Sequence, residues 1–386
     1  MDNPTNNRFI DLNPTRPTNK SDLLESTPSG LYCPIGDFYI DPQHKVKRAL
    51  ITHAHADHSR YGMDSYLSHH FNEGVMRKRL GDSIAFQGIQ YNETLNINGV
   101  NVSFHPAGHI PGSAQIRLEH KGDVWVVTGD YKCNDDGLST PFEPVKCRVF
   151  YTESTFALPV FHWGKQENVF AEIHDYWREC TTRGEHLILQ AYSLGKAQRL
   201  LNNLDRSIGT IYCHGAINEM NLALKTSGAL HNAKIDFWNY RLLSDISNKT
   251  TKTRSKTPQV RSNPEPISLP QEKQSETNVN RSVLDKTEKT SLPLDPDSSE
   301  PGLIISPASG ITDALLKKLK HYRIAQCSGW MAIRGRQRWE NLDRGFILSD
   351  HADWNELIWA CKETGAEDIR PVHGYTEVLK RWVEEN

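Results

Sequence analysis

One short run, residues 53–58, constrains this chain more than any other feature of its sequence. The run reads HAHADH and follows directly on the apolar residues 49–51. Clustered histidines are costly to fold, because neighbouring imidazoles cannot all carry a charge and each buried ring needs hydrogen-bond partners. Metal ions remove that difficulty, since neutral imidazole and ionised carboxylate are both good ligands. The run therefore indicates a metal site.

Length and composition set broad limits. A chain of 386 residues favours two domains over one, and a net charge of -2 means that any nucleic-acid contact needs a local basic face. Seven scattered cysteines without a CxxC pair predict a reduced, cytoplasmic setting. Residues 1–20 are polar and are expected to form a disordered leader without a signal peptide. We expect no membrane partner, since no apolar stretch is long enough to span a bilayer.

Strand patterns dominate the first part of the chain. We expect strands at 38–42, 47–51, 115–119 and 124–128, and a hairpin around the Asn98-Gly99 turn. These segments predict a β-rich region with the HAHADH run at the end of one strand.

After Glu153 the pattern changes to alternating helix and strand. Helices are expected at 169–181 and 196–201, and a buried strand at 186–190, which is typical of α/β proteins. Residues 247–301 hold few apolar side chains and are expected to form a disordered insertion. A solvated linker is the simpler reading of that insertion, and its basic first half would also suit a nucleic-acid tether.

Two points of metal binding follow from the HAHADH run itself. Alternation along an extended or turning backbone can direct His53 and His55 to one point, and Asp57 with His58 to another. One loop therefore offers ligands to two metal positions.

Two further motifs complete the ligand set. In residues 106–109 (PAGH), Gly108 allows a tight backbone before His109. In residues 128–130 (TGD), Asp130 ends an apolar strand, where its carboxylate can bridge two cations.

Taken together, these motifs resemble the metallo-β-lactamase fold, in which Asp41 would match an acidic residue that supports the site. That fold hosts many reactions, so later motifs must distinguish them. Residues 151–156 (YTESTF), 348–353 (LSDHAD) and 371–374 (PVHG) resemble motifs A, B and C of the β-CASP nucleases. The resemblance implies an α/β protein: a metallo-β-lactamase αββα sandwich with an inserted β-CASP α/β domain.

The resemblance also implies domain boundaries. The metallo-β-lactamase domain is expected over residues 21–160 and 345–386, and the β-CASP domain over 161–344, which contains the insertion at about 247–301. Four segments resemble the bacterial DNA ligase-associated exonucleases of the β-CASP group: 30–34, 36–41, 142–145 and 195–198.

Carried over residue by residue, the resemblance implies two divalent cations, with Zn²⁺ expected and Mn²⁺ as an alternative. The implied ligands of the first cation are His53, His55, His109 and Asp130. Those of the second are Asp57, His58, His373 and the bridging Asp130. The resemblance further implies that Asp57, Glu153 and His351 are catalytic: Glu153 orients a histidine, and His351 is the general acid.

Substrate contacts rest on weaker patterns. Ser193 and Lys196 lie at an expected helix start, where backbone N–H groups and the ammonium could hold a phosphate; ordinary helix initiation at a serine is the alternative. Arg334 lies near Trp330, and the pair could line a strand channel. A core tryptophan beside surface arginines fits that pattern equally well.

The sequence thus predicts a two-metal phosphodiesterase that cleaves DNA, as an exonuclease of DNA repair with a DNA ligase and a helicase as functional partners. A β-CASP ribonuclease is the alternative, because His373 at motif C is typical of RNA-processing members of the group. A small-molecule hydrolase and a non-catalytic scaffold are disfavoured by the β-CASP motifs and by the complete ligand set.

Overall fold

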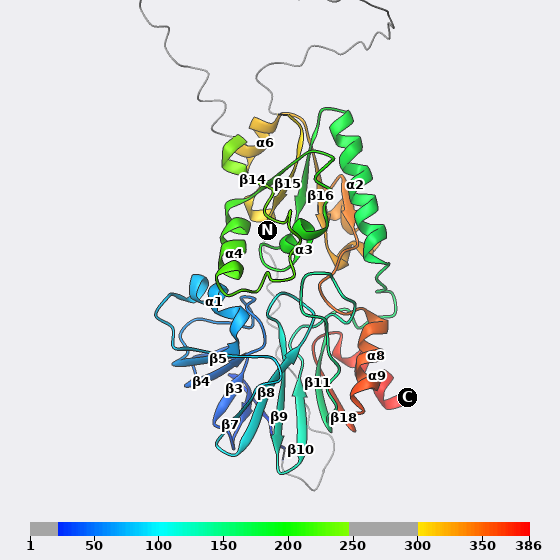
Figure 1. Cartoon of the computed structure of the whole chain (residues 1–386). Coiled ribbons are helices and arrows are strands. Elements are labelled where there is room, and N and C mark those ends of the chain that lie inside the picture. Colours follow the sequence, from blue (N-terminus) through cyan, green and yellow to red (C-terminus); the bar gives the residue numbers. More distant parts are fainter. Residues whose placement is uncertain (1–21, 247–299) are drawn as a thin grey trace, which may run out of the picture.

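The computed structural model describes residues 22–246 and 300–386, and three six-stranded sheets form the framework of these parts (Figure 1). The expected leader and nearly all of the expected insertion lie outside the described residues. Among the helices of the described parts, none has the length and apolar character needed to cross a membrane.

The first sheet carries the HAHADH run at its edge. Its strands, in spatial order, are β1 (Glu25–Thr27), β2 (Gly30–Cys33), β3 (Phe38–Ile40), β4 (Arg48–Ile51), β5 (Ser65–His69) and β6 (Phe86–Ile89). Strands β3 to β6 pair in parallel. The carboxyl ends of neighbouring parallel strands meet at one edge of a sheet, so Asp41 after β3 and His53 after β4 lie at the same edge.

The second sheet brings the C-terminal motif beside the middle of the chain. Its strands, in spatial order, are β18 (Asp368–Gly374), β11 (Val149–Ser154), β10 (Asp123–Val127), β9 (Ala114–His120), β8 (Val100–Pro106) and β7 (Thr94–Ile97). Strand β11 runs parallel to both β10 and β18. Asp130, Glu153 and His373 therefore follow or end three parallel strands at one edge.

The first two sheets pack face to face. One apolar cluster draws on both of them, for example through Phe38 and Leu50 of the first sheet and Phe104 and Trp125 of the second. The outer face of the first sheet is covered by α1 (Glu73–Leu80), which follows the short helix η1 (His70–Asn72). The outer face of the second sheet is covered by α8 (Trp354–Thr364) and α9 (Thr376–Glu385).

The third sheet is parallel throughout and forms the upper lobe in Figure 1. Its strands, in spatial order, are β14 (Arg241–Leu242), β13 (Thr210–Cys213), β15 (Gly302–Ser306), β12 (His186–Gln190), β16 (Tyr322–Cys327) and β17 (Arg344–Phe346). The helices of this lobe are α2 (Gln166–Thr182), α3 (Lys196–Asn203), α4 (Gly215–Thr226), η2 (Ala308–Gly310), α6 (Asp313–Leu319), η3 (Gly329–Ala332) and α7 (Arg336–Trp339).

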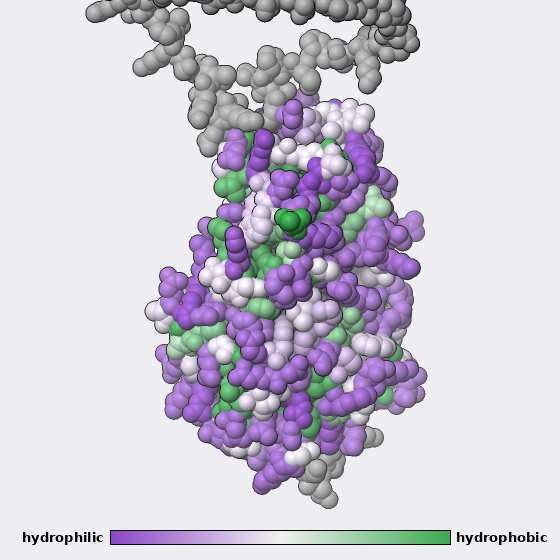
Figure 2. Space-filling model, viewed as in Figure 1, coloured by the Kyte–Doolittle hydropathy of each residue, from purple (hydrophilic) through white to green (hydrophobic). Residues whose placement is uncertain are grey.

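Both faces of the third sheet are apolar, because a parallel sheet is covered on both sides. In β12, Leu187 and Leu189 pack against α2 and α3, whereas Ile188 between them packs on the side of α6. The face of the molecule in Figure 2 is mainly hydrophilic, with apolar residues in small scattered patches.

The expected strand at 186–190 and the hairpin at Asn98-Gly99 are confirmed. The expected helix at 196–201 is also present and begins at Lys196. Ser193 therefore lies three residues before the first helical residue. The domain boundaries remain predictions.

Candidate metal centre

Three imidazole rings converge at the edge where the first two sheets meet. Nδ1 of His55 lies 3.1 Å from Nε2 of His53 and 3.1 Å from Nε2 of His109. The Asp130 carboxylate completes the group, with Oδ2 3.5 Å from His53 and 3.7 Å from His109. The four ligand atoms all lie within 4.8 Å of one another. His53, His109 and Asp130 are buried, and His55 is partly exposed.

The outer nitrogens of these rings are held by acceptors. The carbonyl of Asp350 accepts from Nδ1 of His109 at 2.8 Å, and the carbonyl of Leu194 accepts from Nε2 of His55 at 3.2 Å. The Thr52 hydroxyl donates to Asp41 at 2.5 Å, so it can only accept from Nδ1 of His53, 3.1 Å away. A carbonyl cannot donate, and the Thr52 hydroxyl has already given its proton to Asp41. The ring proton is therefore on the outer nitrogen of each of the three rings.

The inner nitrogens therefore present three lone pairs to one another. Desolvation by burial lowers the pKa of all three rings, His53 and His109 well below the ordinary value, so the rings stay neutral. Lone pairs only 3.1 Å apart repel unless a cation lies between them. Two nitrogens bound tetrahedrally at a Zn–N distance of about 2.0–2.1 Å lie roughly 3.3 Å apart. The donor set and its spacing fit a divalent cation such as zinc.

A second group of donors lies next to the same carboxylate of Asp130. Nε2 of His58 is 3.5 Å from Oδ2 of Asp130 and 3.9 Å from the carboxylate of Asp57. Asp41 accepts from Nδ1 of His58 at 2.7 Å, which directs Nε2 toward Asp130. Desolvation disfavours a charge on His58, but Asp130 and Asp41 outweigh it and raise its pKa well above the ordinary value. The negative field that favours this proton also favours a cation.

His373 lies at the exposed side of this second group. Its ring centre is 5.9 Å from that of His58, and its backbone is left-handed, with φ at 56°. Asp41 is left-handed as well, with φ at 42°. Non-glycine residues seldom adopt this conformation, and such strain is concentrated at functional sites.

Two glycines are required where these loops cross. A Cβ on Gly108 would lie 2.2 Å from the carbonyl oxygen of Lys132, and its φ is 71°. A Cβ on Gly129 would lie 2.5 Å from the Thr52 hydroxyl, and its φ is 58°. The expected tight backbone at Gly108 is confirmed, and Gly129 lets Asp130 follow β10 directly beside Thr52.

Glu153 and His351 form a hydrogen-bonded pair next to Asp130. Oε2 of Glu153 lies 2.9 Å from Nδ1 of His351, and Oε1 accepts from the backbone N–H of Tyr131 at 2.7 Å. Nδ1 of His351 is also 4.0 Å from Asp130. Desolvation lowers the affinity of His351 for a proton, but the charges of Glu153 and Asp130 outweigh it and raise its pKa to about 9. This ring is therefore charged at neutral pH and can donate a proton.

The residues expected to bind substrate are placed differently. Lys196 is buried, and its ammonium donates to the Asp350 carboxylate at 2.9 Å and to the Leu348 carbonyl at 3.0 Å. The structure therefore directs Lys196 to an internal ion pair and not to solvent. Ser193 is half-buried and its carbonyl accepts from Gln198. Arg334 is exposed, while Trp330 is half-buried and packs against Phe156 and Phe161.

Two residues of the site carried no sequence-based assignment. Asp350 pairs with Lys196 and with Arg199 at 3.2 Å, and its carbonyl fixes His109. Thr52 fixes His53. Their only signal in the sequence is position: Asp350 directly precedes His351, and Thr52 directly precedes His53.

Known proteins resemble this chain over different lengths, although no family model matches it. A protein of Opitutus terrae named "Probable DNA ligase" is 24% identical over 348 residues, which cover 90% of this chain and 28% of that protein. "RNase aCSPSF2" of Saccharolobus solfataricus is 30% identical over 122 residues, covering 31% and 24%. "Endoribonuclease ysh-1" of Neurospora crassa is 32% identical over 127 residues, covering 32% and 15%. The chain thus spans less than a third of the length of these relatives.

A solved structure shares the fold. The crystal structure of a protein of unknown function from Enterococcus faecalis V583 matches with a TM-score of 0.50 at 11% identity, covering 88% of this chain and 78% of that one. The chain is a mixed α/β protein with several sheets. Over about a third of its length it is similar to proteins that are named as RNases.

Proposed function

We propose that this chain is a two-metal phosphodiesterase that cleaves DNA as an exonuclease and acts in DNA repair with a DNA ligase. The observation that carries the proposal is the convergence of three imidazole lone pairs beside Asp130. The named relatives support it, because they comprise nucleases and a DNA ligase.

The proposed architecture is a metallo-β-lactamase sandwich over residues 21–160 and 345–386, with a β-CASP domain inserted at 161–344. Two observations support it. The first two sheets share one core, and all strands of the third sheet fall between residues 186 and 346.

The proposed ligands follow the two groups of donors. The first cation would be held by His53, His55, His109 and Asp130, and the second by Asp57, His58, His373 and Asp130. When bound, two such cations activate water and stabilise the charge of the phosphodiester oxygens. The chain's own acid is His351, which donates a proton to the departing oxygen while Glu153 orients and charges the ring.

DNA is the proposed substrate because the likeness to the ligase-named protein extends over 90% of this chain, whereas the likeness to the RNases covers about a third. RNA is the second candidate. The names of those relatives favour it, and so does His373, since a histidine at this motif is typical of RNA-processing members of the group.

The test compares labelled DNA and RNA strands of one sequence, each incubated with chelator-treated protein and added Zn²⁺ or Mn²⁺. We expect metal-dependent, stepwise shortening of DNA, with little cleavage of RNA. Asp130→Ala should abolish cleavage and metal content together, whereas Asp313→Ala on exposed α6 should leave both unchanged. A clear preference for RNA would overturn the choice of substrate. Full activity of Asp130→Ala would overturn the two-metal mechanism.

A further inference from the structure

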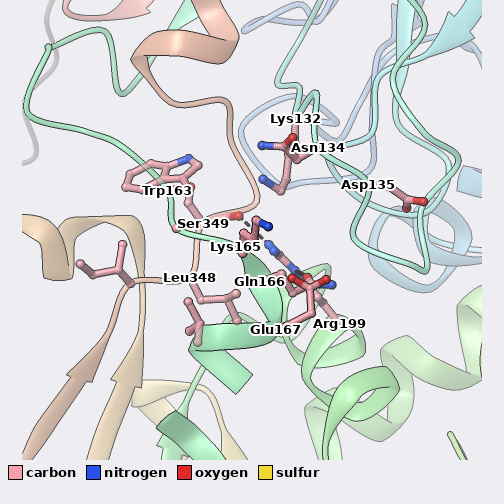
Figure 3. A pocket seen from close by; sticks show the side chains of 13 residues that line it. Lys132, Asn134, Asp135, Trp163, Lys165, Gln166, Glu167, Arg199, Leu348 and Ser349 are labelled. Carbon is pink, nitrogen blue, oxygen red and sulfur yellow. Dashed lines mark hydrogen bonds between the residues drawn. The ribbon is translucent and has the colours of Figure 1, made fainter. Parts of the chain in front are cut away.

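A cavity of about 240 Å³ is lined in part by Leu348 and Ser349, which precede His351 in the sequence (Figure 3). Ser349 forms part of its wall, and the indole of Trp163 donates from Nε1 to the His351 carbonyl at 2.8 Å. The wall of the cavity is thus bonded to the segment that carries His351. Its volume equals roughly eight water molecules of the liquid. That is below the about 300 Å³ at which pockets for larger organic ligands begin, and it suits a small, hydrated group.

Three cationic side chains line this cavity: Lys132, Lys165 and Arg199. Lys132 is 3% exposed, and its ammonium lies 3.7 Å from Glu356, beyond hydrogen-bond reach. Within the described residues, no acceptor is bonded to this ammonium, although it carries three donors. The ion pair with Glu356 is too long to be a hydrogen bond and offsets only part of the cost of burying this ammonium, so its donors can still bind an oxygen-rich partner. In Figure 3 the ends of Lys132 and Asn134 extend into the space bordered by Trp163 and Ser349.

Arg199 offers a second set of donors. Its Nε donates to Gln166 at 2.6 Å, and its Nη1 donates to the Ser349 carbonyl at 2.6 Å and to Asp350. Its Nη2 has no acceptor among residues 22–246 and 300–386. These bonds hold the guanidinium plane fixed, so the remaining donors are already oriented when a ligand enters.

The amino terminus of α2 forms another side of the cavity. This helix has 17 residues, and its N-cap Lys165 makes no side-chain capping bond. The first N–H groups of a helix favour an anion, and here they act beside Lys165, which is exposed and bonds to no acceptor in the part of the chain that the structure describes. Two carboxylates also line the cavity. Asp135 accepts from the backbone N–H of Gly137 and lies to the side in Figure 3, whereas Glu167 is exposed to solvent.

We propose that this cavity binds a phosphate group, held by Lys132, Lys165, Arg199 and the first turn of α2. The phosphate could be carried by the end of a nucleic-acid strand or be free in solution. The link to a strand rests on the proposed function, but phosphate binding does not. A bound phosphate would touch Ser349, two residues from His351, and so could fix the segment that carries the general acid.

The experiment is calorimetric titration of the full chain, as purified and after chelator treatment, in a phosphate-free buffer. The probes are inorganic phosphate and two otherwise identical trinucleotides, one with a 5′-phosphate and one with a 5′-hydroxyl. Lys165→Gln removes one charge-assisted contact and should weaken phosphate binding about tenfold. Glu167→Gln removes the opposing charge and should tighten it about threefold. Lys317→Gln, an exposed lysine on the distant α6, should change nothing.

Each outcome decides between the sources or against the site. Tighter binding of the 5′-phosphorylated trinucleotide supports a strand end, and equal binding of both trinucleotides together with phosphate binding supports free phosphate. Equal phosphate affinity of the wild type and Lys165→Gln would overturn the proposal. So would phosphate binding that disappears when metal is removed, since it would then belong to the metal centre. Nuclease activity plays no part in these readouts, so this proposal and the proposed function can fail separately.

Discussion

Replacing Glu153 by Gln should remove the charge that keeps His351 protonated. Glu153 is 1% exposed, and its two oxygens have different partners: Tyr131 N–H and the His351 ring. An amide has nearly the same shape, so the fold should be kept. The backbone N–H of Tyr131 can only donate, so the amide oxygen must stay with it. The amide nitrogen then faces Nδ1 of His351, which must become an acceptor, and the ring proton moves to Nε2.

The size of the effect follows from the pKa of His351. Its rise from 6.5 to about 9 corresponds to about 3 kcal/mol in favour of the charged ring, at 1.36 kcal/mol per unit. Glu153 is the strongest of the groups that raise it, ahead of Asp130, and desolvation acts in the opposite direction. Without the Glu153 charge, we expect the pKa of His351 to fall by about 2 units. The general acid would then lose its proton near neutral pH.

The assay is an NMR titration of the histidine rings in chelator-treated protein, with the His351 signal assigned from its loss in His351→Gln. Glu384→Gln, an exposed substitution near the C-terminus, serves as the control. In cleavage assays the alkaline limb of the pH profile should move to lower pH in Glu153→Gln. A pKa of His351 that stays within about half a unit of the wild-type value would refute the reasoning.

The raised pKa of His351 also predicts how the free energy of unfolding depends on pH. A raised pKa in the folded state stabilises the protein fully below the unfolded pKa of about 6.5, and this contribution is lost as the pH rises through about 9. The stability difference between wild type and Glu153→Gln should therefore be largest at pH 6 and should shrink by pH 9.5. Urea unfolding at the two pH values measures it, and a difference that grows with pH would contradict the assignment.

Two further predictions concern the framework of the site. Lys196→Met should lower the free energy of unfolding by about 3 kcal/mol, because it removes one partner of a buried ion pair while Arg199 still pairs with Asp350. Urea unfolding measures this difference, and the exposed substitution Lys317→Met is the control. Gly129→Ala should lower the free energy of unfolding by about 2 kcal/mol or more and reduce the metal content, because the new Cβ would collide with Thr52 and displace Asp130. Unchanged metal content by elemental analysis would contradict this prediction.

Local patterns identified the strands well. The strand that precedes HAHADH and the strand that precedes TGD were both predicted, but they belong to different sheets. That their ends lie together was implied only by the family resemblance, because a pattern within one strand does not say which sheet the strand joins. The hairpin at Asn98-Gly99 was equally visible, since Asn98 and Gly99 both have positive φ there.

The position of Lys196 could not be derived in this way. A serine and a lysine at a helix start are typical of a phosphate site, and the sequence nearby contains nothing against that reading. The partner that holds the Lys196 ammonium in the interior, Asp350, lies 154 residues further along the chain. Burial of an ion pair depends on two segments meeting, and a pattern within one segment carries no information about the other.

Whether the histidine cluster can bind metal likewise depends on residues that are far apart in the sequence. His55 and His109 present lone pairs to a cation only because their outer nitrogens donate to carbonyls, and these belong to Leu194 and Asp350. Leu194 precedes the helix α3 of the third-sheet lobe, and Asp350 is tied to that helix through Lys196 and Arg199. The proposed ligands therefore come from the first two sheets, while the tautomers of His55 and His109 are set by Leu194, next to α3, and by Asp350, which is paired with α3. A displacement of α3, such as the loss of Lys196 would cause, should therefore disturb the candidate metal centre by moving these two carbonyls, although no residue of α3 is a proposed ligand.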